Sequence, residues 1–174
     1  MVDREWREAS DLRSSLVSIG LVVVSGALLR YWNLRHGLIA PLETDVIDPV
    51  LLLMHTGSYR PQALTEPTLP IYLHALVAIV HFILGAIVGA WRSVAEFGPG
   101  QVVAWGRGLS ALLGTAVVFI VYQIGMRWGA RHALLAAGLM AVTPTHVAVS
   151  RQIGEGSPLT FFSALSLLLS LVAI

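Results

Sequence analysis

Five long apolar stretches, separated by shorter polar segments, run along most of the chain. They lie within residues 14–32, 69–91, 107–126, 133–150 and 157–174. About 20 mostly apolar residues in a helix are needed to cross a hydrocarbon core, because no water is present there to satisfy the backbone. The pattern therefore predicts an all-α integral membrane protein, with a single membrane domain over residues 1–174.

The stretch over residues 69–91 decides how many times the chain crosses. If it spans the bilayer, the chain has five transmembrane helices. If it lies at the membrane surface as a juxtamembrane helix, residues 33–106 form one extracytoplasmic loop. Four transmembrane helices then remain, at 14–32, 107–126, 133–150 and 157–174. The arginines do not separate the two topologies, because each places nearly equal numbers inside.

Residues at the ends of these stretches fit a membrane interface. Four of the five tryptophans, at positions 32, 91, 105 and 128, lie in or beside predicted helix ends, which is typical of an aromatic belt. Arg30 closes the first stretch, and its long side chain is expected to extend to the polar interface. No clear cleavage site follows this stretch, so we expect an uncleaved transmembrane helix rather than a signal peptide.

Composition supports a membrane protein and excludes several other classes. The chain is 56% hydrophobic and 12% charged, whereas soluble domains carry roughly 25% charged residues. Most of the surface is therefore expected to contact lipid. The net charge of +1 does not indicate a basic surface for binding nucleic acid. The absence of cysteine excludes disulfides and thiolate–metal chemistry.

The polar segment after the first stretch carries three acids, Glu43, Asp45 and Asp48. Asp48 precedes Pro49, which predicts that Asp48 caps a short helix with proline at its first position. Carboxylates at a membrane face can act as a general base or bind a divalent cation. Solvated loop acids without catalytic work are the simpler alternative for Glu43 and Asp45.

Two histidines share one face of the predicted helix over 69–91. His74 and His81 are seven positions apart, and no third ligand stands at helical spacing. We therefore expect them to pack inside the protein rather than bind a metal, and we predict no metal site. The chain also has no glycine-rich phosphate loop, no nucleophile elbow and no zinc-binding His-Glu-x-x-His motif.

Several short blocks occur in order along the chain. They are LRYWNL at 29–34, IDP at 47–49, HTG at 55–57, EPTLPIYL at 66–73, RGLSALLGT at 107–115, VY at 121–122 and SPLTFF at 157–162. Together these blocks resemble the protein mannosyltransferase-like branch of the GT-C membrane glycosyltransferases. Their order and spacing match the first four membrane helices of that family over nearly the whole chain.

The resemblance implies a topology and a chemistry. The first long loop of such enzymes faces away from the cytoplasm and carries juxtamembrane helices, which favours four crossings. We expect the bacterial inner membrane, with the N-terminus in the cytoplasm. These enzymes pass a sugar from a polyprenyl-phosphate lipid to a protein, lipid or glycan acceptor. An aspartate in the first loop, within a His-Pro-Asp-Glu stretch, acts as the base.

This sequence departs from the family at the expected catalytic positions. The His-Pro-Asp-Glu stretch falls on residues 40–43, which read Ala-Pro-Leu-Glu, so Leu42 takes the place of the aspartate. A later acid of the family falls on Gly156, with Glu155 one place away. Such enzymes also have more crossings, so we expect a truncated descendant or a fragment of a longer protein.

Two hypotheses follow. The first is a non-catalytic, GT-C-derived membrane subunit that contacts lipids and packs with other membrane subunits. The second is the N-terminal part of an active inverting glycosyltransferase. In that case Glu43 or Asp45 would be the base, and Arg107 or Arg151 would neutralise the donor phosphate. Neither hypothesis requires a cofactor beyond a bound polyprenyl or other lipid, and neither predicts a nucleic-acid partner.

Overall fold

The computed structural model describes residues 2–34, 39–58 and 68–173, and its regular elements are all helical. This confirms the all-α prediction for the described part of the chain. In order, the elements are α1 (Val2–Tyr31), α2 (Pro41–Thr56), α3 (Leu69–Ile87), the 3-10 turn η1 (Val94–Glu96), α4 (Pro99–Gly125), the 3-10 turn η2 (Met126–Trp128), α5 (Ala130–Val142), α6 (Pro144–Val149) and α7 (Gly156–Val172).

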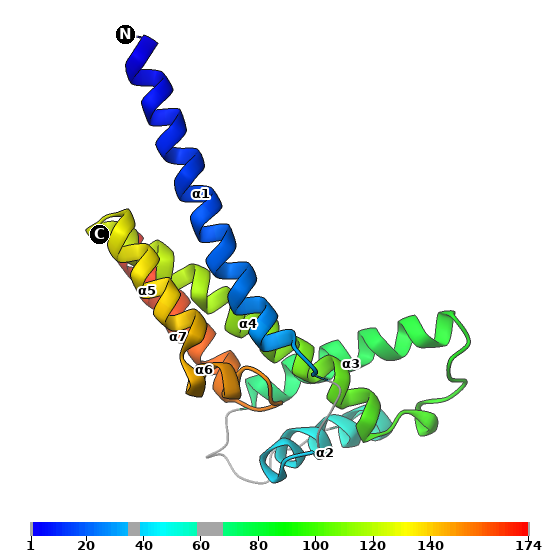
Figure 1. Ribbon diagram of the computed structural model, residues 1–174. Coiled ribbons are helices and arrows are strands. Elements are labelled where there is room, and N and C mark those ends of the chain that lie inside the picture. Colours follow the sequence, from blue (N-terminus) through cyan, green and yellow to red (C-terminus); the bar gives the residue numbers. More distant parts are fainter. Residues whose placement is uncertain (1, 35–38, 59–67, 174) are drawn as a thin grey trace.

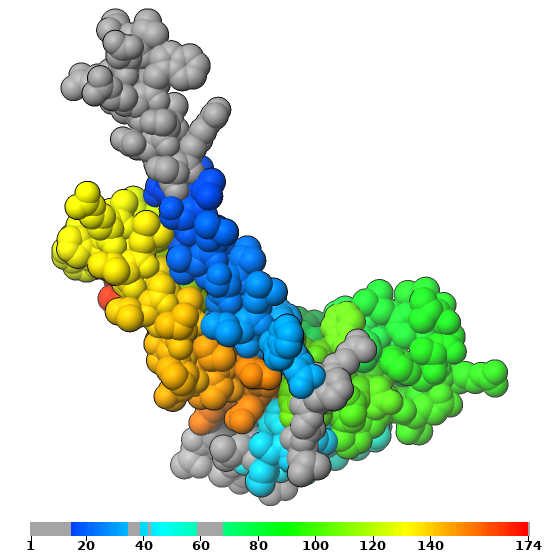
Figure 2. Space-filling model, in the orientation of Figure 1, coloured from blue at the N-terminus to red at the C-terminus, as the bar shows by residue number. Residues whose placement is uncertain are grey.

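The helices form two groups that share α4. The C-terminal part of α4 packs with α1, α5 and α7 in a bundle, while its N-terminal part contacts α2 and α3. Figure 1 shows α3 running across the direction of the bundle helices and away from them. The connection between α3 and α4 forms a lobe that projects from the bundle (Figure 2).

Apolar side chains cover α3 on every side. Its buried face packs Ile71, Ala75 and Ala78 against the core, and its outer face exposes Leu76 and Ile83. By length and composition, α3 and the helical segment Pro99–Trp128 could each cross a membrane. Shorter apolar helices cover Ser15–Tyr31, Ala130–Val142 and Gly156–Val172. The exact number of crossings stays a prediction.

Helix α2 begins at Pro41, eight residues earlier than the Asp48–Pro49 pattern predicts. Pro41 occupies its first turn, and the backbone N–H of Ala40 donates to Glu43 Oε2 over 2.9 Å. Because this first turn is capped by Glu43, Pro49 falls inside the helix rather than at its start. The prediction that Asp48 caps the helix was therefore wrong.

The apolar stretch at 133–150 contains two helices rather than one. Helix α5 ends at Val142, and α6 begins at Pro144. Proline has no backbone N–H and its ring clashes with the preceding turn, so a continuous helix is broken there. The break turns the chain toward the loop at 150–155, which leads into α7.

The bundle depends on close approach between α4 and α5. A Cβ added at Gly125 would lie 2.6 Å from the Cα of Ala133, so the backbones meet with no side chain between them. Ala133 and Ala137 are fully buried in the same cluster, beside Val118 and Tyr122. Small residues at the contact thus allow the helices to pack tightly, as is common in membrane bundles.

Candidate functional site

Glu43 and Arg107 form a buried ion pair where α2, α4 and the loop before α7 meet. Arg107 Nε donates to Glu43 Oε1 over 2.9 Å, and Arg107 Nη2 donates to Oε2 over 2.7 Å. The carboxylate side chain is completely buried, and the guanidinium side chain is 7% exposed. Two parallel hydrogen bonds from a guanidinium to one carboxylate are among the strongest polar contacts in proteins.

Backbone groups complete this centre. The N–H of Ile153 donates to Glu43 Oε1 over 3.0 Å, and the N–H of Ala40 donates to Oε2. Arg107 Nη1 donates to the carbonyl oxygen of Leu34, just after α1. One carboxylate and one guanidinium therefore connect the segment after α1, the start of α2, the middle of α4 and the loop before α7.

This environment holds Glu43 in its ionised form. Burial alone would raise the pKa of the Glu43 carboxyl. The hydrogen bond from Arg107, those from the N–H groups of Ile153 and Ala40, and the positive charge of Arg107 outweigh burial and lower that pKa below its usual value. Each carboxylate oxygen already accepts two hydrogen bonds, so little capacity remains to take a proton from a substrate.

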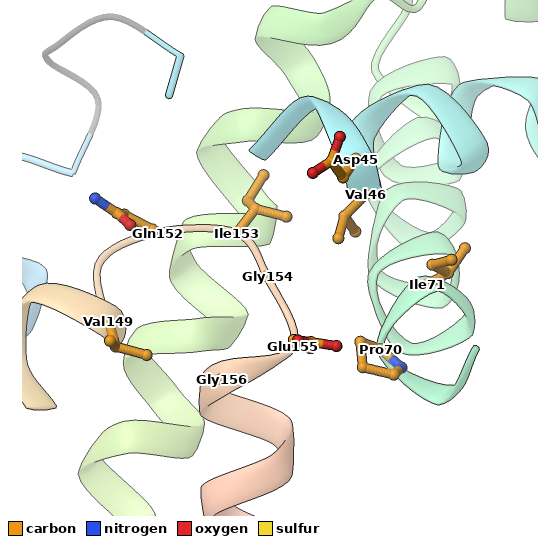
Figure 3. Close-up of a pocket in the computed structure, with 10 residues that line it drawn as sticks. All are labelled: Asp45, Val46, Pro70, Ile71, Val149, Gln152, Ile153, Gly154, Glu155 and Gly156. Carbon is orange, nitrogen blue, oxygen red and sulfur yellow. The ribbon is translucent and has the colours of Figure 1, made fainter. Parts of the chain in front are cut away.

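Asp45 lies only two residues further along α2 but in a different setting. It is exposed and lines a cavity of about 350 Å³. The cavity is bounded by α2, α3 and the segment from α6 to α7 (Figure 3). Its lining residues are Asp45, Val46, Pro70, Ile71, Val149, Gln152, Ile153, Gly154, Glu155 and Gly156.

Asp45 and Glu155 line the same cavity from different elements, α2 and the loop before α7. Figure 3 shows Asp45 on α2 directed away from Glu155, whose carboxylate extends from the loop toward Pro70. Gly156, on which the sequence resemblance places the family's later acid, also lines this cavity. The sequence pattern did not reveal that Asp45 and Glu155 share a cavity, because α2 and the loop are distant along the chain.

The predicted phosphate-binding arginines do not line this cavity. Arg107 is neutralised by Glu43. Arg151 Nη2 donates to the carbonyl oxygen of Trp32 over 2.7 Å, which connects the loop before α7 to the segment after α1. The charged residues of the lining are Asp45 and Glu155, both acids. Because like charges repel, a phosphate group would need added positive charge to bind there.

Of the two histidines on α3, His74 packs in the interior as expected, and His81 is half-buried among aromatic rings. His74 is 1% exposed and lies beside Gly106 of α4. His81 stacks on Trp105 with ring centroids 4.6 Å apart, and it meets the edges of Trp91 and Phe97. In the described part of the chain, no three side chains of histidine, aspartate or glutamate are grouped as metal ligands.

The predicted roles of Glu43, Asp45, Arg107 and Arg151 in catalysis stay predictions.

Leu42 has a described backbone within α2, but its side chain lies outside the described residues. Its position in the first turn places its backbone beside Glu43 at the start of the helix. The alignment that puts Leu42 in the place of the family's aspartate therefore rests on the sequence alone.

Comparison with known proteins identifies the family. No curated protein matches the chain, and no solved structure matches it. The sequence model described as dolichyl-phosphate-mannose-protein mannosyltransferase matches residues 70–173, which is more than half of the chain. This match agrees with the resemblance drawn from the sequence blocks and with the apolar helices. The chain is thus a GT-C-like membrane protein that belongs to the dolichyl-phosphate-mannose-protein mannosyltransferase family.

Proposed function

We propose that this chain is a non-catalytic, GT-C-derived membrane subunit that packs within a larger membrane protein assembly. The state of Glu43 is the observation that carries the proposal. An inverting sugar transfer needs a carboxylate that can take the proton of the acceptor hydroxyl. Glu43 instead accepts hydrogen bonds from Arg107, Ile153 and Ala40, and its pKa is lowered, so it is a poor base.

The residues at the family's catalytic positions point the same way. Leu42 stands where the family has the aspartate that acts as the base, and an aliphatic side chain takes no proton. Gly156 stands where the family has its later acid, and glycine has no side chain. With both positions altered, the Glu43–Arg107 pair is left as a structural centre that joins α2 and α4 to the segment after α1 and to the loop before α7.

The outer surfaces of the bundle support a role within an assembly. Leu21 and Leu28 of α1 and Leu167 and Leu169 of α7 are more than half exposed. Apolar side chains on this scale must be covered by lipid or by protein. A non-catalytic subunit would use such faces to pack against neighbouring membrane helices.

A second candidate function is an active transferase, and one specific observation favours it. Asp45 and Glu155 line one cavity, and both side chains are exposed. A shift of a few residues within α2 and the loop would let Asp45 replace the missing base. In that case Arg107 would still be occupied by Glu43, and the donor phosphate would require another positive charge.

Two measurements on the full chain separate these functions. Native mass spectrometry after purification in mild detergent reports whether the chain stays in a stoichiometric complex or carries a bound polyprenyl lipid. A transfer assay with dolichyl-phosphate-mannose and a hydroxyl-bearing peptide reports catalysis. We expect a complex and no transfer above the protein-free background.

Matched acid variants make the assay decisive. Asp45→Asn and Glu155→Gln remove the two acids of the cavity, whereas Asp48→Asn removes an exposed acid of the same helix that does not line it. Transfer that is abolished by either cavity variant and retained in Asp48→Asn would establish the enzyme and overturn the non-catalytic proposal.

A further inference from the structure

Arg30, near the end of α1, is a fully buried cation inside the bundle. Its exposure is 0%, so the prediction that it extends to the polar interface was wrong. Arg30 Nη1 donates to the carbonyl oxygens of Gly26 at 2.8 Å and Ala141 at 3.1 Å, and Nη2 donates to that of Met140 at 3.2 Å. Within the described residues, the one ion pair is between Glu43 and Arg107, so no carboxylate balances Arg30.

The break between α5 and α6 explains why these carbonyls bind Arg30. In a continuous helix, the carbonyl oxygen of Met140 would accept the N–H of residue 144. Pro144 has no N–H, so that carbonyl lacks its helical partner. The guanidinium of Arg30 supplies the missing donors, and it thereby joins the end of α5 to α1.

His146 provides the remaining partner. Arg30 Nη2 lies 2.6 Å from His146 Nδ1. A guanidinium has only donors, so His146 must accept with an unprotonated Nδ1 and carry its proton on Nε2. A doubly protonated His146 would have no acceptor at Nδ1, and it would place a second positive charge against a buried cation.

We infer that the Arg30–His146 hydrogen bond is an acid-sensitive latch, which holds α6 against α1 at neutral pH and releases it when His146 takes a second proton. The proposal rests on the geometry of a buried cation bound to a neutral imidazole. Histidine is the side chain whose charge ordinarily changes in the mildly acidic range. Release of α6 would break the contact between α6 and the end of α1.

The charged groups around His146 leave Arg30 as its immediate electrostatic partner. Helices α1, α4 and α5 pack against α6. Arg30 is the one charged residue of α1 among its described side chains, and Arg107 of α4 is paired with Glu43. Arg131 and His132 lie at the opposite end of α5, and on the loop after α6 Arg151 binds the carbonyl of Trp32 while Glu155 lines the cavity.

The latch would control the cavity because α6 leads directly into its lining. Val149 of α6 and the loop residues 152–155 form one side of the cavity (Figure 3). The hydroxyl of Ser150 donates to the carbonyl oxygen of His146, and that of Ser157 lies 3.4 Å from the carbonyl oxygen of Val149. A movement of α6 would therefore shift the loop and uncover the start of α7.

A single cysteine at position 157 tests this device, because the chain has no cysteine of its own. Ser157 is 3% exposed, so Ser157→Cys introduces a thiol of similar shape that is protected while the latch is closed. Its reaction with 4,4′-dithiodipyridine is measured between about pH 7.5 and about pH 4, a range that spans ordinary histidine titration. The rate is divided at each pH by that of Ser93→Cys, an exposed position.

Two substitutions separate the latch from general acid effects. His146→Asn places an amide oxygen near the position of Nδ1 that accepts a hydrogen bond but takes no proton. His132→Asn is the control, since His132 is exposed and binds the carbonyl of Trp128.

We expect the rate ratio to rise about tenfold on acidification, because labelling follows the population of the open form. The rise should be lost in His146→Asn and retained in His132→Asn. If the rate ratio stays constant across this pH range while His146 is intact, the proposal is overturned, whatever the His146 variants show. A rise that persists in His146→Asn would overturn it as well.

Discussion

Glu43 and Arg107 are 64 positions apart in the chain, yet they share two hydrogen bonds of 2.9 and 2.7 Å in the interior of the protein. Removal of one member of such a pair leaves the other charge buried without compensation, which typically costs about 3–5 kcal/mol. We therefore expect Glu43→Gln to lower the free energy of unfolding by about this amount.

Chemical unfolding in detergent micelles, followed by tryptophan fluorescence, measures this loss. Asp48→Asn on the same helix is the matched control, because Asp48 is exposed and its replacement should change stability by less than about 0.5 kcal/mol. Equal stabilities for Glu43→Gln and Asp48→Asn would show that the buried pair contributes nothing to the fold.

The same pair predicts how stability depends on pH. The pKa of Glu43 is lower in the folded protein than in the unfolded chain. The stability that Glu43 contributes is therefore fully present above the ordinary glutamate pKa of about 4.3, and it is lost as the pH falls through the lower folded-state pKa. The difference in unfolding midpoint between the parent chain and Glu43→Gln should be constant near neutral pH and shrink in acid. A difference that grows in acid would contradict the assigned direction of the shift.

Part of this structure could be predicted from the pattern of apolar residues, and part could not. The helices α3, α4 and α7 each cover a long apolar stretch, but α4 begins at Pro99, eight residues before the predicted stretch at 107–126. The start of α2 did not follow, because Asp48 before Pro49 is a good helix start in isolation. The tertiary contacts of Glu43 outweigh that local preference and begin the helix at Pro41.

The Glu43–Arg107 ion pair could not be predicted from the local sequence pattern. Glu43 and Arg107 were each assigned a separate catalytic role, since a pattern along the chain does not reveal which distant side chains meet. One physical signal was available in the low charge content. In a chain with 12% charged residues, a charge that the fold buries must be paired or hydrogen-bonded, and Glu43 and Arg107 meet this need together.

The close contact between α4 and α5 predicts that replacing glycine by alanine changes the unfolding free energy in opposite directions at two positions of α4. Gly125→Ala would place a methyl group 2.6 Å from the Cα of Ala133, and backbone atoms cannot move aside as a flexible side chain can. We expect a loss of about 1–3 kcal/mol in unfolding free energy from this overpacking. Gly108→Ala, in the same helix, meets no atom within 4 Å, and alanine should stabilise the helix there by about 0.5–1 kcal/mol. Thermal unfolding of the two variants compares them directly, and a stabilised Gly125→Ala would show that the helices do not approach so closely.

The membrane topology predicts a reciprocal pattern of cysteine labelling, which the absence of native cysteine makes clean. With four crossings and a cytoplasmic N-terminus, position 93 lies in the extracytoplasmic loop and position 130 lies on the cytoplasmic side. In intact cells, an impermeant maleimide should then label Ser93→Cys and leave Ala130→Cys unlabelled until the membrane is permeabilised. Both positions are exposed in the fold, so burial does not account for a lack of reaction. With five crossings α3 would span the bilayer, and the pattern would reverse, with labelling at 130 and protection at 93. The exposed apolar face of α3 would contact lipid in either case, but only the four-crossing pattern would leave α3 lying along the membrane surface.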